Sequence, residues 1–287
     1  MQRITLNQST QPISGIGLFS AQPATITIEP NESATGIVFA FKDQQIPAHI
    51  GSLSTRPAHP VFAQMKPRCT SVGNNTHTIA TIEHILSALA GLGVTDAIIQ
   101  IQSDAAHAEI PILDGSSMPF VEAILDAGTQ QLDTTIEPIR VRETIEVRDA
   151  DALISIEPSE TPSYTYHIDY PDSPIGMSSV TWYGDRDEYI SSVAPARTFS
   201  LEHEANQMQS LGLFTHLTPE DMLVIGDDGP IDNDFRIDEE CARHKLLDLI
   251  GDLAMVGAPI VAKISANRSG HALAHDAARA ILDQSKN

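Results

Sequence analysis

The sequence predicts an α+β protein of two related domains, in which helices cover sheets. The chain has 287 residues, enough for two domains of ordinary size, and 41% of them are hydrophobic, enough for packed cores. Each half also shows several strand-like segments followed by helical ones. We expect a polar linker over 129–138, between a first domain over 1–132 and a second over 138–287.

Apolar spacing in the first half predicts three strands and two helices. The strands are expected at 25–29, 36–41 and 94–102, and the helices at 78–93 and 119–128. Gly91 and Gly93 would end the first helix, and a proline at the start and a glycine at the end delimit the second. A loop rich in Pro, Ser and His, at about 51–60, lies between the first two expected strands and the first expected helix.

The second half repeats this order of strands and helices. Strands are expected at 139–149, 152–158, 164–170, 221–226 and 259–266, and helices at 201–214, 236–257 and 271–284. The stretch from about 196 to 225 is less regular than the rest. The two halves therefore look related, each ending in helices that could cover its own sheet.

Composition excludes several classes of protein. The chain has 38 acidic and 17 basic residues and a net charge of −21, which argues against a nucleic-acid partner. No apolar run is long enough for a membrane helix, and the N-terminus lacks the apolar core of a secretory signal. Two cysteines cannot form a disulfide framework. We expect a cytoplasmic monomer that acts on a small molecule, without stable membrane insertion.

A polar row runs along the helix expected at 236–257. His244 and Asp248 are four residues apart and share one helix face, and Asp252 lies one turn further on. An imidazole and a carboxylate form half of a normal zinc ligand set. Such a pair is more often a surface contact, but the remaining residues of this helix are largely apolar, so the row needs partners in the interior.

Glu83 and His84 form a second candidate near the start of an expected helix. Neighbouring helical side chains point about 100° apart, so His84 can bind a metal while Glu83 stands beside it to accept a proton from water. The alternative is an acid favoured by the helix dipole next to an exposed histidine. The sequence by itself favours this alternative.

A third candidate is His271, which follows the tight turn Ser269-Gly270 and precedes the last helix. It could serve as a general acid or belong to a helix cap. Among the other histidines, five receive no role: His49, His59, His77, His107 and His275. The sequence contains no P-loop, no dinucleotide-binding turn and no EF-hand.

Five motifs in this order resemble one family. They are TIEHILSALAGLG, EIPILDGSSMPFVEAILDAG, ARTF, RHKLLDLIGDL and SGHAL, and the likeness runs from residue 15 to the final helix. Together they are similar to UDP-3-O-acyl-N-acetylglucosamine deacetylase, the zinc amidase that commits bacteria to lipid A synthesis. The resemblance implies two two-layer α/β-sandwich domains, each with a small insert, and an active site between them.

The resemblance also implies a role for each matching residue. The metal ligands would be His84, His244 and Asp248, holding Zn²⁺, although Fe²⁺ suits the same ligands. Catalysis would fall to Glu83 as general base, His271 as general acid, Asp252 as the carboxylate that orients His271, and Thr198 at the oxyanion. Lys245 and Arg268 would contact the substrate near its diphosphate. The acyl chain would run along a passage in the second insert, with candidate lining residues Phe199, Leu201, Met208, Leu211 and Leu213.

Two departures from the family pattern leave alternatives open. Phe19 replaces the histidine that usually ends the motif G-x-G-L-H, and the second insert lacks the usual glycine pair. A zinc amidase acting on a different N-acyl sugar is therefore one alternative. A non-catalytic relative that binds zinc structurally is another, although Glu83, Asp252 and His271 would have no structural duty there.

Overall fold

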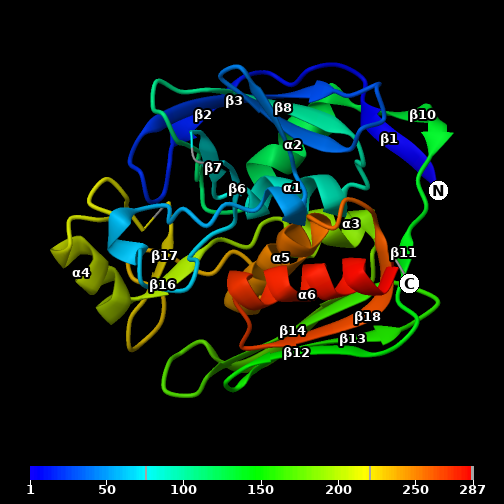
Figure 1. Ribbon diagram of the computed structural model, residues 1–287. Helices are drawn as coiled ribbons and strands as arrows, with labels where there is room; N and C mark the ends of the chain where they lie inside the picture. Colours follow the sequence, from blue (N-terminus) through cyan, green and yellow to red (C-terminus); the bar gives the residue numbers. More distant parts are fainter. Residues whose placement is uncertain (75, 220, 286–287) are drawn as a thin grey trace.

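The structure is a computed structural model that describes residues 1–74, 76–219 and 221–285. Residue 220 of the predicted insert, and residues 75 and 286–287 of the predicted domains, lie outside this description. The two largest sheets form the outer layers of the molecule, and helices lie between them (Figure 1). No helix in the described ranges is long and apolar enough to cross a membrane.

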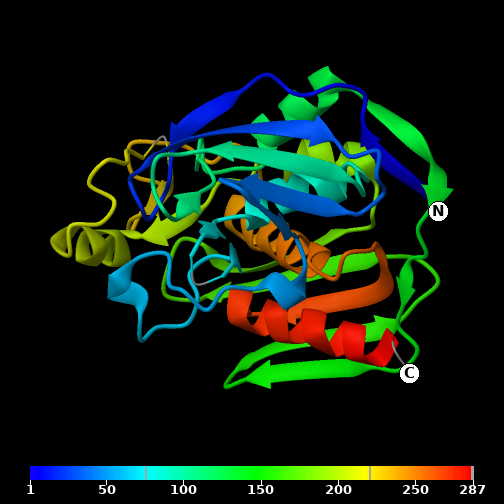
Figure 2. The same cartoon turned by 45° about the horizontal axis from the view of Figure 1, so that its top comes forward.

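The first sheet has five strands, and two helices flank its central strand in the sequence. Its strand order is β2 (Ile13–Ile16), β3 (Pro23–Pro30), β8 (Ala97–Gln102), β4 (Ile37–Phe41) and β5 (Gln44–Pro47). The helix α1 (Glu83–Gly91) precedes the central strand β8, and α2 (Met118–Ala127) follows it. In the turned view of Figure 2 the sheet lies across these helices.

The second sheet repeats this plan. Its strand order is β12 (Ile145–Asp149), β13 (Ala152–Pro158), β18 (Ile260–Asn267), β14 (Ser163–Tyr170) and β15 (Gly176–Trp182), and β11 (Ile139–Arg140) adds to β18. The helix α5 (Glu240–Ala254) precedes β18, and α6 (His271–Ser285) follows it. In both sheets only one pair along the path is parallel, β8 with β4 and β18 with β14. This repeat confirms the α+β fold class with two related halves.

Each half carries an insertion between its sheet and its first helix. The first contains two short 3-10 helices (Ile50–Ser52 and Pro60–Phe62), β6 (Ser71–Gly73) and β7 (Thr78–Ala80), which pairs with β9 (Ala108–Glu109). The second contains α3 (Arg186–Glu188), a π-helix (Tyr189–Val193), β16 (Phe199–Leu201), α4 (Glu202–Ser210) and β17 (Leu223–Ile225). In the second, β16 and β17 are parallel neighbours.

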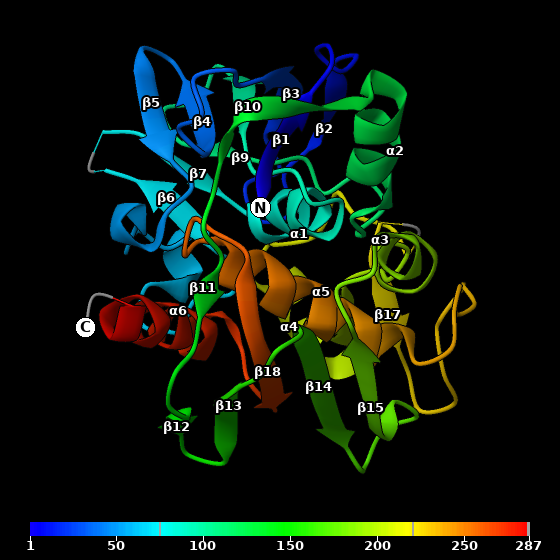
Figure 3. The same ribbon diagram turned by 90° about the vertical axis from the view of Figure 1, so that its right-hand side faces the viewer.

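The helices α1 and α5 form the centre of the molecule, as the end-on view of Figure 3 shows. Most residues of both helices are buried, because α1 packs against α5 and α2, and α5 packs against α1, α6 and the strands β14 and β15. The helices approach closely at Gly251, where an added Cβ would lie 2.0 Å from the carbonyl oxygen of Glu83. The two backbones therefore meet without a side chain between them.

The helix predicted over 78–93 begins later than expected. Residues 78–80 form the strand β7, which pairs with β6 and β9, and Thr81 has a left-handed φ of 58°. The β-branched pair Thr78-Ile79 favours a strand, and its partners come from other parts of the chain. Glu83 and His84 are consequently the first two residues of α1.

The linker predicted over 129–138 is also wrong in part. Residues Thr129–Thr135 form β10, which pairs antiparallel with β1 (Gln2–Leu6). The polar composition of this segment suits an exposed two-stranded ribbon as well as a linker.

The helices predicted at 201–214 and 236–257 are shorter than expected, spanning Glu202–Ser210 and Glu240–Ala254. The proposed domain boundaries remain a prediction.

Replacing Gly251 with alanine tests the contact between α1 and α5. In an ordinary helix interior this change stabilises a protein by about 1 kcal/mol. Here the new Cβ has no room, and we expect the free energy of unfolding to fall by about 1–3 kcal/mol. Gly270 is the control, since nothing lies within 4 Å of its added Cβ. Denaturant unfolding measures both variants, and an unchanged G251A would contradict the contact.

Candidate metal centre and active site

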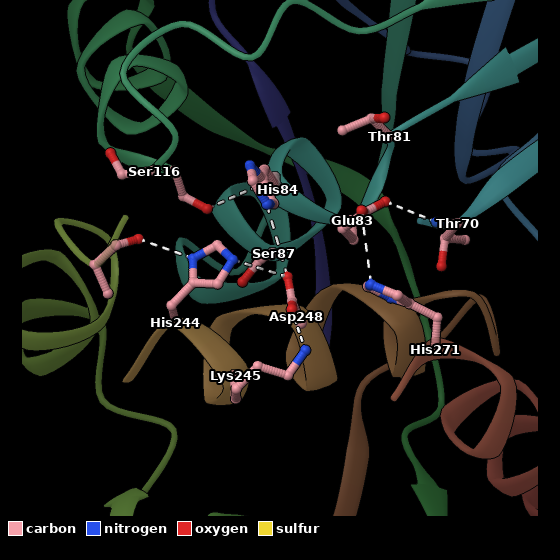
Figure 4. A network of polar contacts seen from close by, with 12 residues as sticks. Thr70, Thr81, Glu83, His84, Ser87, Ser116, His244, Lys245, Asp248 and His271 are labelled. Atoms are coloured by element: carbon pink, nitrogen blue, oxygen red, sulfur yellow. Dashed lines mark hydrogen bonds and ion pairs between the residues drawn. The ribbon is translucent and has the colours of Figure 1, made fainter. Parts of the chain in front are cut away.

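Two imidazoles and a carboxylate from α1 and α5 meet in the interior (Figure 4). His84 comes from the first turn of α1, and His244 and Asp248 lie one turn apart on α5. Asp248 Oδ1 is 3.6 Å from His84 Nε2 and 3.5 Å from His244 Nε2. All three residues are buried. The structure thus brings together the three ligands predicted from the sequence.

The geometry of these three residues fits a single metal ion. Ligands about 2.0–2.2 Å from a tetrahedral ion lie roughly 3.3–3.6 Å from one another. The three donor atoms lie within 4.8 Å of one another, and both separations from Asp248 are close to that value. His244 Nδ1 donates to the carbonyl of Ala196 at 3.1 Å, which leaves Nε2 free to bind an ion.

The charge states of the ligands also suit a metal. Burial lowers the pKa of His244 to about 3, so its imidazole is neutral. Burial opposes the ionisation of Asp248, but the Lys245 ammonium beside it holds its pKa well below the usual range. Lys245 Nζ donates to Asp248 Oδ2 at 2.7 Å, so that Oδ1 is the oxygen that faces both imidazoles.

A second pair of groups, Glu83 and His271, stands beside the ligands. Glu83 Oε1 lies 4.0 Å from His271 Nε2, and Glu83 Oε2 accepts a hydrogen bond from the backbone N–H of Thr70 at 2.9 Å. Burial raises the pKa of Glu83 to about 7. Burial disfavours the imidazolium of His271, but Asp252, bonded to its Nδ1 at 2.9 Å, raises the pKa of His271 to about 9.

These two pKa values suit Glu83 and His271 to proton transfer. At neutral pH Glu83 exchanges its proton readily, while His271 stays protonated and able to give one up. Oxygen and nitrogen atoms of Glu83, Asp248 and His271 also lie within 4.8 Å of one another, as a second metal position would require. A protonated imidazole is no metal ligand, however, so the charge state favours proton transfer at this position.

The loop before β16 closes another side of the centre. Arg197 is buried and binds the buried Glu240 of α5 with Nε to Oε1 at 2.7 Å, which fixes this loop to the helix. Thr198 follows it and is half-buried. The ring of Phe199 lies 6.4 Å from that of His244. Thr198 therefore lies on the loop that holds both the hydrogen-bond partner and a ring neighbour of a candidate ligand.

Lys245, Arg268 and Leu201 line one cavity of about 590 Å³. Tyr166, Tyr170 and His203 also line it, and Lys245 connects it to the metal centre through Asp248. The side chain of Arg268 is half exposed, and its Nη1 lies 3.4 Å from Asp169 Oδ2. A second cavity of about 330 Å³, beyond the C-terminal ends of α1 and α5, has a mainly apolar lining and contains none of the predicted site residues.

The residues predicted for the acyl passage do not share one environment. Met208 and Leu213 are buried in a cluster with Phe19, whereas Leu211 is 50% exposed. Phe19 itself is buried, and its ring packs 5.4 Å from Phe62 and 5.8 Å from Phe214. The phenylalanine at the usual histidine position therefore joins the two insertions.

Two polar residues of the site were missed in the sequence. Thr70 is fully buried and bonds to Glu83 through its backbone and to Asp252 through its hydroxyl. His275, which received no role, is buried with its Nε2 2.7 Å from the Thr70 hydroxyl. The i,i+4 spacing of His271 and His275 on α6 was the available signal, whereas no local pattern marks Thr70.

A buried set of ligands that can hold a metal ion, next to a tuned acid–base pair, is the arrangement of a metal-dependent hydrolase. The family model of UDP-3-O-acyl N-acetylglycosamine deacetylase matches residues 3–283. This chain therefore belongs to that family.

Individual relatives agree with the family assignment. A UDP-3-O-acyl-N-acetylglucosamine deacetylase of Campylobacter hominis is 34% identical over 288 residues, covering 100% of this chain and 94% of the relative. One of Leptospira biflexa is 35% identical, covering 96% and 89%. One of Solibacter usitatus is 36% identical, covering 91% and 84%. The likeness spans both sheets, so a non-catalytic relative or an amidase for another sugar is not favoured.

Removing one ligand should empty the metal centre. We expect His244→Ala and Asp248→Ala to weaken metal binding by more than the roughly 10- to 100-fold that loss of an outer hydrogen bond costs. The exposed residue His203 supplies the control, His203→Ala, which should keep the metal content of the unaltered protein. Metal analysis of dialysed protein measures all three variants. Full metal content in His244→Ala would contradict the assignment.

Proposed function

We propose that this protein hydrolyses the N-acetyl group of UDP-3-O-acyl-N-acetylglucosamine, giving UDP-3-O-acyl-glucosamine and acetate, the committed step of lipid A biosynthesis. The observation that carries the proposal is the approach of Glu83 Oε1 to His271 Nε2, 4.0 Å apart, beside the buried ligands from α1 and α5. The family match over residues 3–283 supplies the substrate.

The metal in this proposal is Zn²⁺, held by His84, His244 and Asp248. Fe²⁺ suits two imidazoles and a carboxylate nearly as well. When bound, such an ion polarises a carbonyl as a Lewis acid and lowers the pKa of a water molecule. Three protein ligands leave one position of a tetrahedral ion for substrate or water, as a catalytic site requires.

The remaining steps belong to side chains of this chain. Glu83 accepts a proton at its carboxylate as water adds to the acetamide carbon. His271 donates the proton on Nε2 to the nitrogen of the sugar as the C–N bond breaks, and acetate leaves. Asp252 holds His271 by its Nδ1 and keeps it charged. Thr198 would donate a hydrogen bond from its hydroxyl to the developing oxyanion.

The cavity beside Lys245 suits the nucleotide part of the substrate. Lys245 and Arg268 would bind a diphosphate there as hydrogen-bond donors, and their charges act locally against the net charge of −21. Each base already has a carboxylate partner, Asp248 for Lys245 and Asp169 for Arg268. Phe199 and Leu201, next to the centre and in the cavity wall, would contact the sugar and the start of the acyl chain.

In this proposal each of the two domains contributes residues to the active site. The first domain, 1–132, supplies Glu83 and His84, and the second, 138–287, supplies the remaining ligands, the acid and the acyl passage of about 196–225. We propose that the protein works in the cytoplasm as a monomer on a small-molecule substrate.

Turnover of UDP-3-O-acyl-N-acetylglucosamine before and after chelation tests this function. We expect activity to be lost to a chelator and restored by Zn²⁺. Glu83→Gln should lower kcat by about 10²- to 10⁴-fold while the metal content stays unchanged, because Glu83 transfers a proton and binds no metal. Glu122→Gln, on the exposed face of α2, should keep full activity. Full turnover in Glu83→Gln would contradict the mechanism.

The pH dependence of kcat/KM should be bell-shaped. The rate rises as Glu83 loses its proton, from a pKa of about 7, and falls as His271 loses its proton, from a pKa of about 9. A bound dication favours the carboxylate and disfavours the imidazolium, so it moves both limbs to lower pH. Asp252→Asn should move the alkaline limb lower still, because Asp252 is the strongest of the groups that raise the pKa of His271. An alkaline limb unmoved in that variant would contradict the pairing.

A further inference from the structure

Thr70 is the residue at which the base and the acid of the site are linked. It is fully buried and directly precedes β6. Its backbone N–H donates a hydrogen bond to Glu83 Oε2 at 2.9 Å (Figure 4). Its hydroxyl lies 2.5 Å from Asp252 Oδ1, and the other oxygen of Asp252 accepts from His271 Nδ1. One threonine thus contacts the candidate base and the carboxylate that holds the candidate acid.

The direction of these hydrogen bonds follows from the proton count. A hydroxyl carries a single proton, and an ionised carboxylate can only accept. Thr70 therefore donates to Asp252, and its oxygen can only accept from His275 Nε2, 2.7 Å away. His275 must then carry its proton on Nε2. Burial lowers the pKa of His275, which agrees with a neutral ring bearing one proton.

Both oxygens of Asp252 are occupied as a result. Oδ1 is held by Thr70 and Oδ2 by His271, and Asp252 is 1% exposed, so its carboxylate cannot turn without breaking a buried hydrogen bond. The ring of His271 is held through this carboxylate. His275 lies one turn after His271 on α6, so the two imidazoles approach Asp252 from the same helix face.

We propose that Thr70 and His275 are positioning residues, which hold Glu83 and His271 in the mutual arrangement that proton transfer needs by fixing Asp252 between them. The inference rests on the proposed deacetylation. His275 acts through Thr70, and Thr70 acts through Asp252 and Glu83. Neither residue touches the reacting atoms.

Isosteric and conservative variants separate this role from simple packing. Thr70→Val removes the hydroxyl and keeps the backbone N–H, and we expect kcat to fall about 10- to 100-fold with KM within about two-fold. His275→Phe removes the donor and should lower kcat about 10-fold. Thr70→Ser and His275→Gln each keep a donor or hydroxyl and should recover kcat to within about three-fold of the unaltered protein. Metal content should stay constant throughout.

Non-additivity gives a second criterion. Because both residues act through one chain of hydrogen bonds, the double variant Thr70→Val/His275→Phe should lose no more than Thr70→Val alone. The matched control is Thr78 and His107, another Thr–His pair, 3.0 Å apart, whose hydrogen bond lies outside this network. Thr78→Val and His107→Phe should keep full kcat.

A readout without turnover keeps the inference separate from the proposed function. The Nδ1 proton of His271, bonded to a buried carboxylate, should give a low-field resonance in the proton NMR spectrum of the metal-free protein, assigned by its absence in His271→Gln. We expect the resonance to move or vanish in Thr70→Val and His275→Phe and to persist in Thr70→Ser and His275→Gln. If the unaltered protein does not deacetylate the substrate, the proposed function fails and the NMR result still decides on the network.

Three outcomes would overturn the positioning role. They are full kcat in both Thr70→Val and His275→Phe, equal losses in the conservative and the disruptive variants, and a His271 resonance unchanged in all of them. If Thr70→Val does not fold, the comparison of His275→Phe with His275→Gln decides alone, because these two variants leave the Thr70–Asp252 bond in place.

Discussion

The close approach of α1 to α5 is the constraint on which the rest of the structure depends. Gly251 leaves no space for a side chain against the carbonyl of Glu83, so the two backbones touch there. That contact fixes the start of α1 beside α5, and it places Glu83 and His84 opposite the polar row of α5. The two sheets cover the outer faces of this helix pair and exclude water from it. The repeated half-folds therefore matter to the site because each supplies one helix of the pair.

Excluding water makes ionisable groups costly, and the site meets this cost by pairing them. The pairing is unequal, and the inequality separates the roles. Asp248 has the Lys245 ammonium as a direct partner, which holds its pKa well below the usual range. Burial raises the pKa of Glu83 to about 7, since its partners are a backbone N–H and an imidazole 4.0 Å away. His244 and His271 are equally buried imidazoles, yet only His271 bonds a carboxylate through Nδ1, and their pKa values of about 3 and about 9 diverge accordingly. The partner of each group thus sets its charge state, and with it whether the group suits metal binding or proton transfer.

Much of this could be predicted from local pattern, and the part that could not is tertiary. The spacing of His244 and Asp248 alone was weak evidence, and their place in a polar row on an otherwise apolar helix strengthened it. Glu83-His84 gained meaning only from the family resemblance. The start of α1 was predicted too early because residues 78–80 pair with strands from elsewhere in the chain. Thr70 carried no sequence signal, since its contacts with Glu83, Asp252 and His275 all come from folding.

The departure at Phe19 bears on the same network from its other side. Phe19 is buried in a cluster that joins Phe62 of the first insertion to Phe214 of the second, and Cys69 belongs to this cluster. Cys69 is the residue directly before Thr70, so the apolar cluster packs beneath the segment whose backbone reaches the base. An apolar ring at position 19 fits this buried cluster, where a histidine would need a polar partner. The proposed ligands and the proposed acid–base pair come from α1, α5 and α6 and lie outside this cluster.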